Sequence, residues 1–203
     1  EYYPWGRFRM IRPPVQEKVP VYMASLGPGN LKLAGEKADG CLPIWVSRER
    51  FPEIREQISM GAAKSGRKVS DITIAPYIFC YTANGPDDLA HGERLLRAHM
   101  AYYVGGMGTF YFNSVCRAGF NTEAKAIKQS WESGNREQAA RDISDQMLQS
   151  IVVLGNAQQC RDQISAFRQA GADLPIINFP HGTDSPAINR TIAALAPKAN
   201  SLT

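Results

Sequence analysis

The sequence predicts an α/β protein in which parallel strands alternate with helices, and two observations carry this prediction. Apolar runs of strand length occur at about 20–26, 41–45, 72–83 and 174–180. A segment with apolar residues at helical spacing follows each run, and glycine or proline lies at most of the boundaries. Because strands and helices alternate, we expect a parallel sheet with right-handed crossovers.

The first β-α unit contains the most informative turn of the chain. An apolar strand leads directly into Gly27, Pro28 and Gly29, and Asn30 is the expected N-cap of a helix that Gly40 ends. Backbone N–H groups of a first helical turn are free, and glycine has no side chain to block a close approach. We therefore expect a phosphate-binding turn. The alternative is a tight turn without a ligand, because Gly-Pro-Gly matches neither the G-x-G-x-x-G nor the Walker pattern.

Two further β-α units follow this turn. Residues 41–45 predict a short buried strand, and residues 51–65 predict a helix that ends at Gly66. The long run at 72–83 is rich in β-branched and aromatic residues, which favours a third strand. Pro86 is well placed to open the next helix, because its missing N–H is tolerated in a first turn.

The region before the last strand departs from this alternation. Residues 105–122 contain four glycines and are expected to form a loop or short excursion. We expect a helical insertion over about 105–156, and a final helix capped by Asp184 or Ser185. Four β-α units in a single domain over residues 1–203 result. Apolar spacing predicts helices at 123–133, 135–151 and 157–170.

The composition is that of a globular protein and excludes several functional classes. Of the 203 residues, 44% are hydrophobic and 21% are charged, which argues against disorder. The net charge of +4 is small and the basic residues are dispersed, so we expect no nucleic-acid partner. No apolar run approaches the roughly 18 residues of a membrane span, and the first residues do not resemble a signal peptide. We expect a cytoplasmic protein without a membrane partner.

The four cysteines do not form a metal motif. Cys41, Cys80, Cys116 and Cys160 lie 36 to 44 residues apart, without a C-x-x-C pair or a histidine at ligand spacing. We therefore expect no metal site. Free thiols that behave as small apolar side chains in a reducing compartment are expected, with a disulfide or redox pair as the alternative.

Ligands of parallel α/β proteins gather at the carboxyl ends of the strands. Trp45 follows the second predicted strand and His181 follows the last, so we expect both at the end where Gly27 lies, in a substrate pocket. The alternatives are a core tryptophan and a surface-loop histidine. His91 and His99 lie eight residues apart on one predicted helix and are expected on its flank, outside the site. No Ser-His-Asp set or carboxylate pair is present, so no catalytic residue is predicted.

A glycine-rich stretch follows the third predicted helix. Residues 102–108 read YYVGGMG and precede Phe110 and Tyr111. We expect packing that terminates the helix. A mobile flap over the pocket is the alternative, because glycines permit hinge motion.

Several segments, in the same order, resemble one enzyme family. Residues 27–40, GPGNLKLAGEKADG, followed by CLPIW, are similar to the segment after the fifth strand of the (β/α)8 barrel in luciferase-like flavin- or deazaflavin-dependent oxidoreductases. AYYVGGMG at 101–108, FNSVCRAGF at 112–120 and VVLGNAQQCRDQISAFRQAGADLPII at 152–177 resemble the second half of the deazaflavin-using branch. The resemblance covers about 19–197. It implies that the strands correspond to strands 5–8 of a TIM barrel.

The resemblance also implies a function. Enzymes of this family transfer a hydride between reduced deazaflavin (coenzyme F420) or FMN and an organic small molecule. Gly27, Pro28, Gly29 and Asn30 stand where the family's turn holds the cofactor phosphate. The family's proton donors lie in the first half of the barrel, so no catalytic residue is carried over. The alternative function is a non-catalytic half-barrel subunit or a module that binds a phosphate-bearing ligand.

A half-barrel needs a partner. Four parallel strands leave two sheet edges with unpaired backbone groups. We expect these edges to be covered by a missing amino-terminal half, by a homo-oligomer, or by the insertion folding across the opening. The chain begins without methionine, as a fragment or processed product would.

Overall fold

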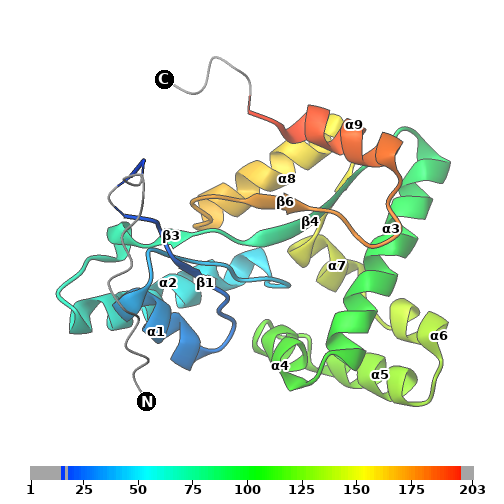
Figure 1. Cartoon of the computed structure of the whole chain (residues 1–203). Helices are drawn as coiled ribbons and strands as arrows, with labels where there is room; N and C mark the ends of the chain where they lie inside the picture. Colours follow the sequence, from blue (N-terminus) through cyan, green and yellow to red (C-terminus); the bar gives the residue numbers. More distant parts are fainter. Residues whose placement is uncertain (1–14, 17, 198–203) are drawn as a thin grey trace, which may run out of the picture.

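The α/β class with parallel strands is confirmed by the computed structural model, which describes residues 15, 16 and 18–197 (Figure 1). Every strand pairing in this part of the chain is parallel. The strands are β1 (Tyr22–Met23), β2 (Gly40–Cys41), β3 (Thr73–Ile74), β4 (Tyr77–Thr82), β5 (Val153–Gly155) and β6 (Ile176–Asn178).

Helices follow most of the strands and also form a group of their own. Figure 1 shows α1 and α2 beside β1 and β3, whereas α4, α5 and α6 gather around the lower end of α3, away from β4. None of the helices in the described ranges is long and apolar enough to cross a membrane. The α-helices are α1 (Pro28–Lys37), α2 (Phe51–Lys64), α3 (Pro86–Ala101), α4 (Thr109–Arg117), α5 (Asn121–Glu132), α6 (Arg136–Arg141), α7 (Asp145–Ile151), α8 (Ala157–Ala170) and α9 (Ser185–Leu195). Short 3-10 helices are η1 (Arg48–Arg50) and η2 (Val69–Asp71), and η3 (Tyr102–Gly106) is a π-helix.

Parallel pairing sets the order of the strands. β1, β2 and β3 pair in that order, and β4 continues from β3 and pairs with β6. The N–H of Tyr77 donates to Pro43 O, whereas Pro76 O accepts from the N–H of Ile176, so β2 and β6 lie on opposite edges of this stretch. The carboxyl ends of β1, β2, β4 and β6 consequently point to one end of the molecule.

Alternate residues of β4 face two separate apolar clusters, as the pleat of a strand requires. Ile78 and Cys80 pack with α1, α2 and α8. Phe79 and Tyr81 pack with α3 and the helices that follow it. Both faces of β4 are therefore buried, which explains why its sequence is almost continuously apolar.

The first helix begins and ends differently from the prediction. Gly27 is the N-cap of α1 and Pro28 its first residue, so the prediction of Asn30 as N-cap is wrong. Proline suits this position because its fixed φ is helical and its missing N–H is not needed. The helix ends at Lys37, and Gly40 begins β2.

The strand predicted at 72–83 is two strands separated at Ala75 and Pro76. Ala75 N–H still donates to Cys41 O at 2.9 Å, but proline has no N–H to continue the ladder. The predicted helix at 135–151 is also divided, into α6 and α7. Ser144 starts the second helix by accepting a hydrogen bond from the N–H of Met147 at 3.2 Å.

The strand β5 lies inside the region predicted as a helical insertion. It pairs with Cys80–Thr82 of β4 and leads into α8, so five β-α units are present among the described residues, not four. The insertion boundary of about 105–156 therefore included part of the sheet. A three-residue strand is too short for its side-chain period to be recognised.

Residues 105–122 are mostly helical, which corrects the predicted loop. The π-helix η3 continues α3, and α4 follows after Gly108. A Cβ built on Gly105 or Gly106 would lie 2.6 or 2.8 Å from atoms of the Trp131 side chain. The two glycines thus permit close packing of the helix end on Trp131, which favours the helix-terminating interpretation over the mobile flap.

Other local predictions are confirmed. Gly66 follows the end of α2 with a φ of +69°, and Asp184 caps α9 by accepting from the N–H of Ala187. All four cysteines are free, and three of them are buried. Burial raises the pKa of the Cys41 thiol to about 12.

Candidate cofactor and substrate site

The turn between β1 and α1 opens into a cavity of about 390 Å³. A Cβ built on Gly27 or on Gly29 would meet no atom within 4 Å. Among the described residues, no side chain caps the N-terminus of α1, so its first N–H groups face this open space without a side-chain partner there. An anion such as a phosphate fits this arrangement. The lining residues are Ala24, Ser25, Leu26, Gly27, Pro28, Gly29, Asn30, Leu42, Ile44, Phe110 and Tyr111.

A cationic side chain lies beside the turn. The guanidinium of Arg117, the last residue of α4, donates to the carbonyl of Leu26 at 3.2 Å. Burial, and then the charge of Arg50, lower the pKa of Arg117. Arg50 is only 4% exposed and is paired with Glu53 through Nε–Oε2 at 3.0 Å and Nη2–Oε1 at 3.1 Å. Glu53 thus neutralises the guanidinium of Arg50, whereas Arg117 has no carboxylate partner among the described residues and lies beside the cavity without lining it.

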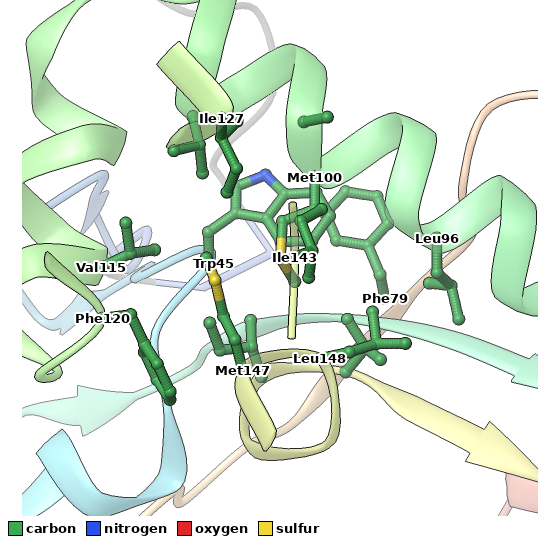
Figure 2. Close-up of a cluster of buried hydrophobic side chains, with 14 of the residues drawn as sticks. Trp45, Phe79, Leu96, Met100, Val115, Phe120, Ile127, Ile143, Met147 and Leu148 are labelled. Carbon is green, nitrogen blue, oxygen red and sulfur yellow. The ribbon is translucent and has the colours of Figure 1, made fainter. Parts of the chain in front are cut away.

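Trp45 lies just beyond β2 in an unusual environment. Its φ of +52° is in the left-handed region, which is rare for a bulky residue. The indole is 2% exposed and stacks on Phe79 with ring centroids 4.3 Å apart. Figure 2 shows the ring among buried side chains that include Met100 and Ile127. The indole N–H has no hydrogen-bond partner among the described residues.

A histidine pair lies next to Trp45. The backbone N–H of His181 donates to Nδ1 of His99 at 2.7 Å. The ring of His99 stacks on Tyr103 with centroids 5.3 Å apart and lies 5.6 Å from the ring of Trp45. These contacts join the end of β2, helix α3 and the loop after β6. The histidine pair borders a cavity of about 440 Å³. Its lining residues are Leu95, Ala98, His99, Tyr102, Tyr103 and His181.

Two tyrosine rings lie between the two cavities. Tyr103 lines the histidine cavity and Tyr111 lines the cavity at the turn, and their ring centroids are 4.7 Å apart. Trp45 and His181 therefore lie at the same end of the sheet as Gly27, which is the placement that the sequence predicted. Trp45 itself lines neither cavity but supports His99 and Tyr103 from behind, so its contact with a ligand stays a prediction.

The carboxyl end of β4 is held by a charged network around Asp88. Its carboxylate accepts from Tyr81 Oη at 2.6 Å, from the N–H of Asn84 at 2.7 Å and from Arg190 Nη2 at 2.6 Å. Arg190 also donates to Thr82 O at 2.7 Å, so α9 is tied to the strand end. Burial acts to raise the pKa of Asp88, but the hydrogen bonds and the charge of Arg190 outweigh it and lower the pKa below its usual value.

This network predicts a pH-dependent contribution to stability. Because the folded pKa of Asp88 is lowered, its stabilisation is complete above the unfolded value of about 3.9 and is lost as pH falls through the folded pKa. We expect Asp88→Asn to lower the free energy of unfolding by about 1.5–3 kcal/mol at pH 7. Urea unfolding of both proteins from pH 7 to pH 2 measures this difference. A difference that grows as the pH falls would contradict the assignment.

The structure unites some predicted site residues and adds others. His181 is joined to His99, which the sequence analysis placed on a helix flank outside the site. Its exclusion from the site stays a prediction. Tyr103 lies four residues after His99, so helical spacing in the sequence could have indicated that the two rings lie next to each other. Arg117 gave no such signal, because its segment looked like a glycine-rich loop and only folding brings it to Leu26.

Comparisons with known proteins place this geometry in a family. The profile of the luciferase-like monooxygenase family matches residues 1–174. A 5,10-methylenetetrahydromethanopterin reductase of Methanopyrus kandleri is 28% identical over 167 residues, covering 82% of this chain and 46% of that protein. The chain therefore spans about half the length of the curated relatives it matches.

Solved structures share the fold. The coenzyme F420-dependent tetrahydromethanopterin reductase from Methanopyrus kandleri superposes with a TM-score of 0.66 at 21% identity, over 87% of this chain and 49% of that chain. An F420-dependent secondary alcohol dehydrogenase, in complex with an F420-acetone adduct, gives 0.62 at 16% identity, over 89% and 50%. With the family profile matching 174 of its 203 residues, the chain belongs to the luciferase-like monooxygenase family.

Proposed function

We propose that this chain is the carboxyl-terminal half of a luciferase-like barrel that transfers a hydride between a reduced deazaflavin or flavin and an organic substrate. The observation that carries the proposal is the open glycine turn at the N-terminus of α1, with Arg117 beside it. Family membership supports the reaction class. The names of relatives that use coenzyme F420 favour the deazaflavin over FMN.

The turn would hold the phosphate of the cofactor. Backbone N–H groups at Gly29 and Asn30 would donate to the phosphate oxygens, and Arg117 would supply a charge-assisted contact. When bound, the deazaflavin or flavin supplies or accepts the hydride, that is, two electrons and one proton. The protein would position the cofactor through the turn and exclude water with Ile44, Phe110 and Tyr111, which line the same cavity.

An amino-terminal half of the barrel would cover the open edges of the sheet. β1 pairs only with β2, and β6 pairs only with β4, among the described residues, so each leaves one edge free. Parallel sheets of this kind are normally closed or covered. We propose that an amino-terminal half completes the barrel and the active site. A second copy of the chain is the next candidate for this role, which light scattering on the 203-residue chain would detect.

The cofactor proposal predicts that Gly29→Val weakens the binding of phosphate-bearing cofactors. The valine side chain would enter open space that the phosphate is proposed to fill, so the variant should fold normally. Loss of two charge-assisted contacts of about 1.5–3 kcal/mol each should weaken binding by roughly two decades or more. Calorimetric titration of FMN and of coenzyme F420 into both proteins measures this.

Two controls separate the turn from general effects on the helix. Riboflavin lacks the phosphate of FMN, so its affinity should change little in Gly29→Val. Leu33→Val places the same side chain on an exposed position of α1 and should bind FMN like the wild type. Arg117→Leu should weaken FMN binding and spare riboflavin. Equal FMN affinity in the wild type and Gly29→Val would remove the turn from the cofactor site.

A further inference from the structure

The histidine cavity contains a hydrogen-bond donor whose tautomer is set by the backbone. Because Nδ1 of His99 accepts from the N–H of His181, the proton of the neutral ring must be on Nε2. Within the described part of the chain, no hydrogen bond engages Nε2. His99 lines the cavity, so this N–H is available to a bound molecule.

The neutral form of His99 is the favoured one. Protonation would put a second proton on Nδ1 and break the hydrogen bond from His181. Burial, and then the neighbouring His181, lower the pKa of His99. The stacked ring of Tyr103 and the rings of Trp45 and Phe79 surround the imidazole with apolar surface.

Apart from the exposed imidazole of His181, the remaining lining is apolar or aromatic. Leu95 and Ala98 lie one helical turn and one residue before His99 on α3, and Tyr102 and Tyr103 continue the same wall. None of the six described lining residues is an aspartate, glutamate, lysine or arginine. An ionised ligand group would be partly desolvated here without gaining a carboxylate, ammonium or guanidinium partner among the described lining residues, which is unfavourable. An uncharged oxygen would lose little and would gain the Nε2–H donor.

We propose that this cavity receives an uncharged carbonyl or alcohol group of the organic substrate, and that His99 Nε2–H donates a hydrogen bond to its oxygen. The proposal rests on the oxidoreductase function proposed above and adds the substrate class. The hydrogen bond orients the oxygen and favours the negative charge that develops on it when its carbon receives a hydride. His99 transfers no proton in this role. His181 is a positioning residue that acts through its backbone N–H.

The cavity can be tested without cofactor on the 203-residue chain. Long-range ¹⁵N–¹H spectra of the histidine rings should show the Nε2–H tautomer for His99. Cyclohexanone should shift the His99 ring signals on titration. Cyclohexanecarboxylate has a similar ring but a negative charge and should not shift them. The Nδ1–H tautomer, an absent response to cyclohexanone, or an equal response to the carboxylate would each overturn the proposal.

Variants identify the hydrogen bond. His99→Leu should weaken cyclohexanone binding about tenfold, as expected for one neutral hydrogen bond. His99→Gln keeps a donor and should retain much of the binding, which guards against a folding defect in the leucine variant. His91→Gln, on the exposed side of the same helix, should bind like the wild type. Wild-type affinity in both His99 variants would exclude the proposed contact.

The outcome is independent of the phosphate turn. If FMN and coenzyme F420 fail to bind while cyclohexanone perturbs His99, the cofactor proposal fails and the cavity remains. If the cofactors bind and cyclohexanone does not perturb His99, the substrate proposal alone is overturned.

Discussion

Gly61→Ala should destabilise the protein by about 3 kcal/mol or more, although alanine normally favours a helix over glycine. A Cβ on Gly61 of α2 would lie 1.8 Å from the carbonyl oxygen of Lys32 in α1. Gly35 makes the reciprocal approach, where a Cβ would lie 2.1 Å from Ile58 O. Both obstacles are backbone atoms, so no side-chain rotation can relieve the clash. Urea unfolding followed by circular dichroism measures the loss.

The matched control is Gly29→Ala on α1. It makes the same substitution in a helix, but the new Cβ meets nothing within 4 Å. We expect it to be neutral or to stabilise by up to about 1 kcal/mol. If Gly61→Ala unfolds at the same urea concentration as this control, the close α1–α2 contact is incorrect. The contact matters for the proposed cofactor site, because the glycine turn lies at the N-terminus of α1.

Trp45→Ala should cost about 3–5 kcal/mol of the free energy of unfolding, the range found when a large buried aromatic is removed. The side chain is 2% exposed and contacts Phe79, His99 and Tyr103. Its loss would leave a cavity beneath the rings of His99 and Tyr103. Chemical unfolding measures the stability. In long-range ¹⁵N–¹H spectra of the folded variant, the ring signals of His99 should indicate a less ordered imidazole than in the wild type.

Trp45→Phe separates the ring from its polar atom. It keeps an aromatic surface against Phe79 and removes an N–H that has no partner among the described residues. A buried unpaired donor costs about 1–3 kcal/mol, which offsets the smaller volume of phenylalanine. We expect near wild-type stability. A loss as large as that of Trp45→Ala would indicate that the indole N–H is bonded in solution.

The fold of the family explains why these residues lie at the same end of the sheet. Residues that follow four different strands meet at one end of the sheet: the turn after β1, Trp45 after β2, His99 on the helix after β4, and His181 after β6. In barrels of this architecture that end carries the active site. The proposed cofactor phosphate and the proposed substrate oxygen would thus be held on either side of the Tyr103–Tyr111 pair.

The alternation of strands and helices could be read from the sequence because it depends on local signals. Apolar runs of strand length, Pro86 at a helix start, Gly66 after a helix and Asp184 as an N-cap all act within a few neighbouring residues. The position of the Gly27 turn and of His181 at one end of the sheet followed from the same alternation, since parallel strands align their carboxyl ends. Local signals failed where an element was short, as at β5, or where glycines serve packing rather than chain reversal, as in η3.

Only the tertiary structure decided which side chains meet there. His99 reaches the site because α3 packs across β4 and the loop after β6 places the His181 N–H against Nδ1. Arg117 reaches the Leu26 carbonyl from 91 positions further along the chain. Such contacts depend on the packing angle of helices and on the strand register, which arise from the whole core. Sequence patterns therefore determined the alternating elements and the end of the sheet that carries the site, while long-range packing determined its donors and its cavities.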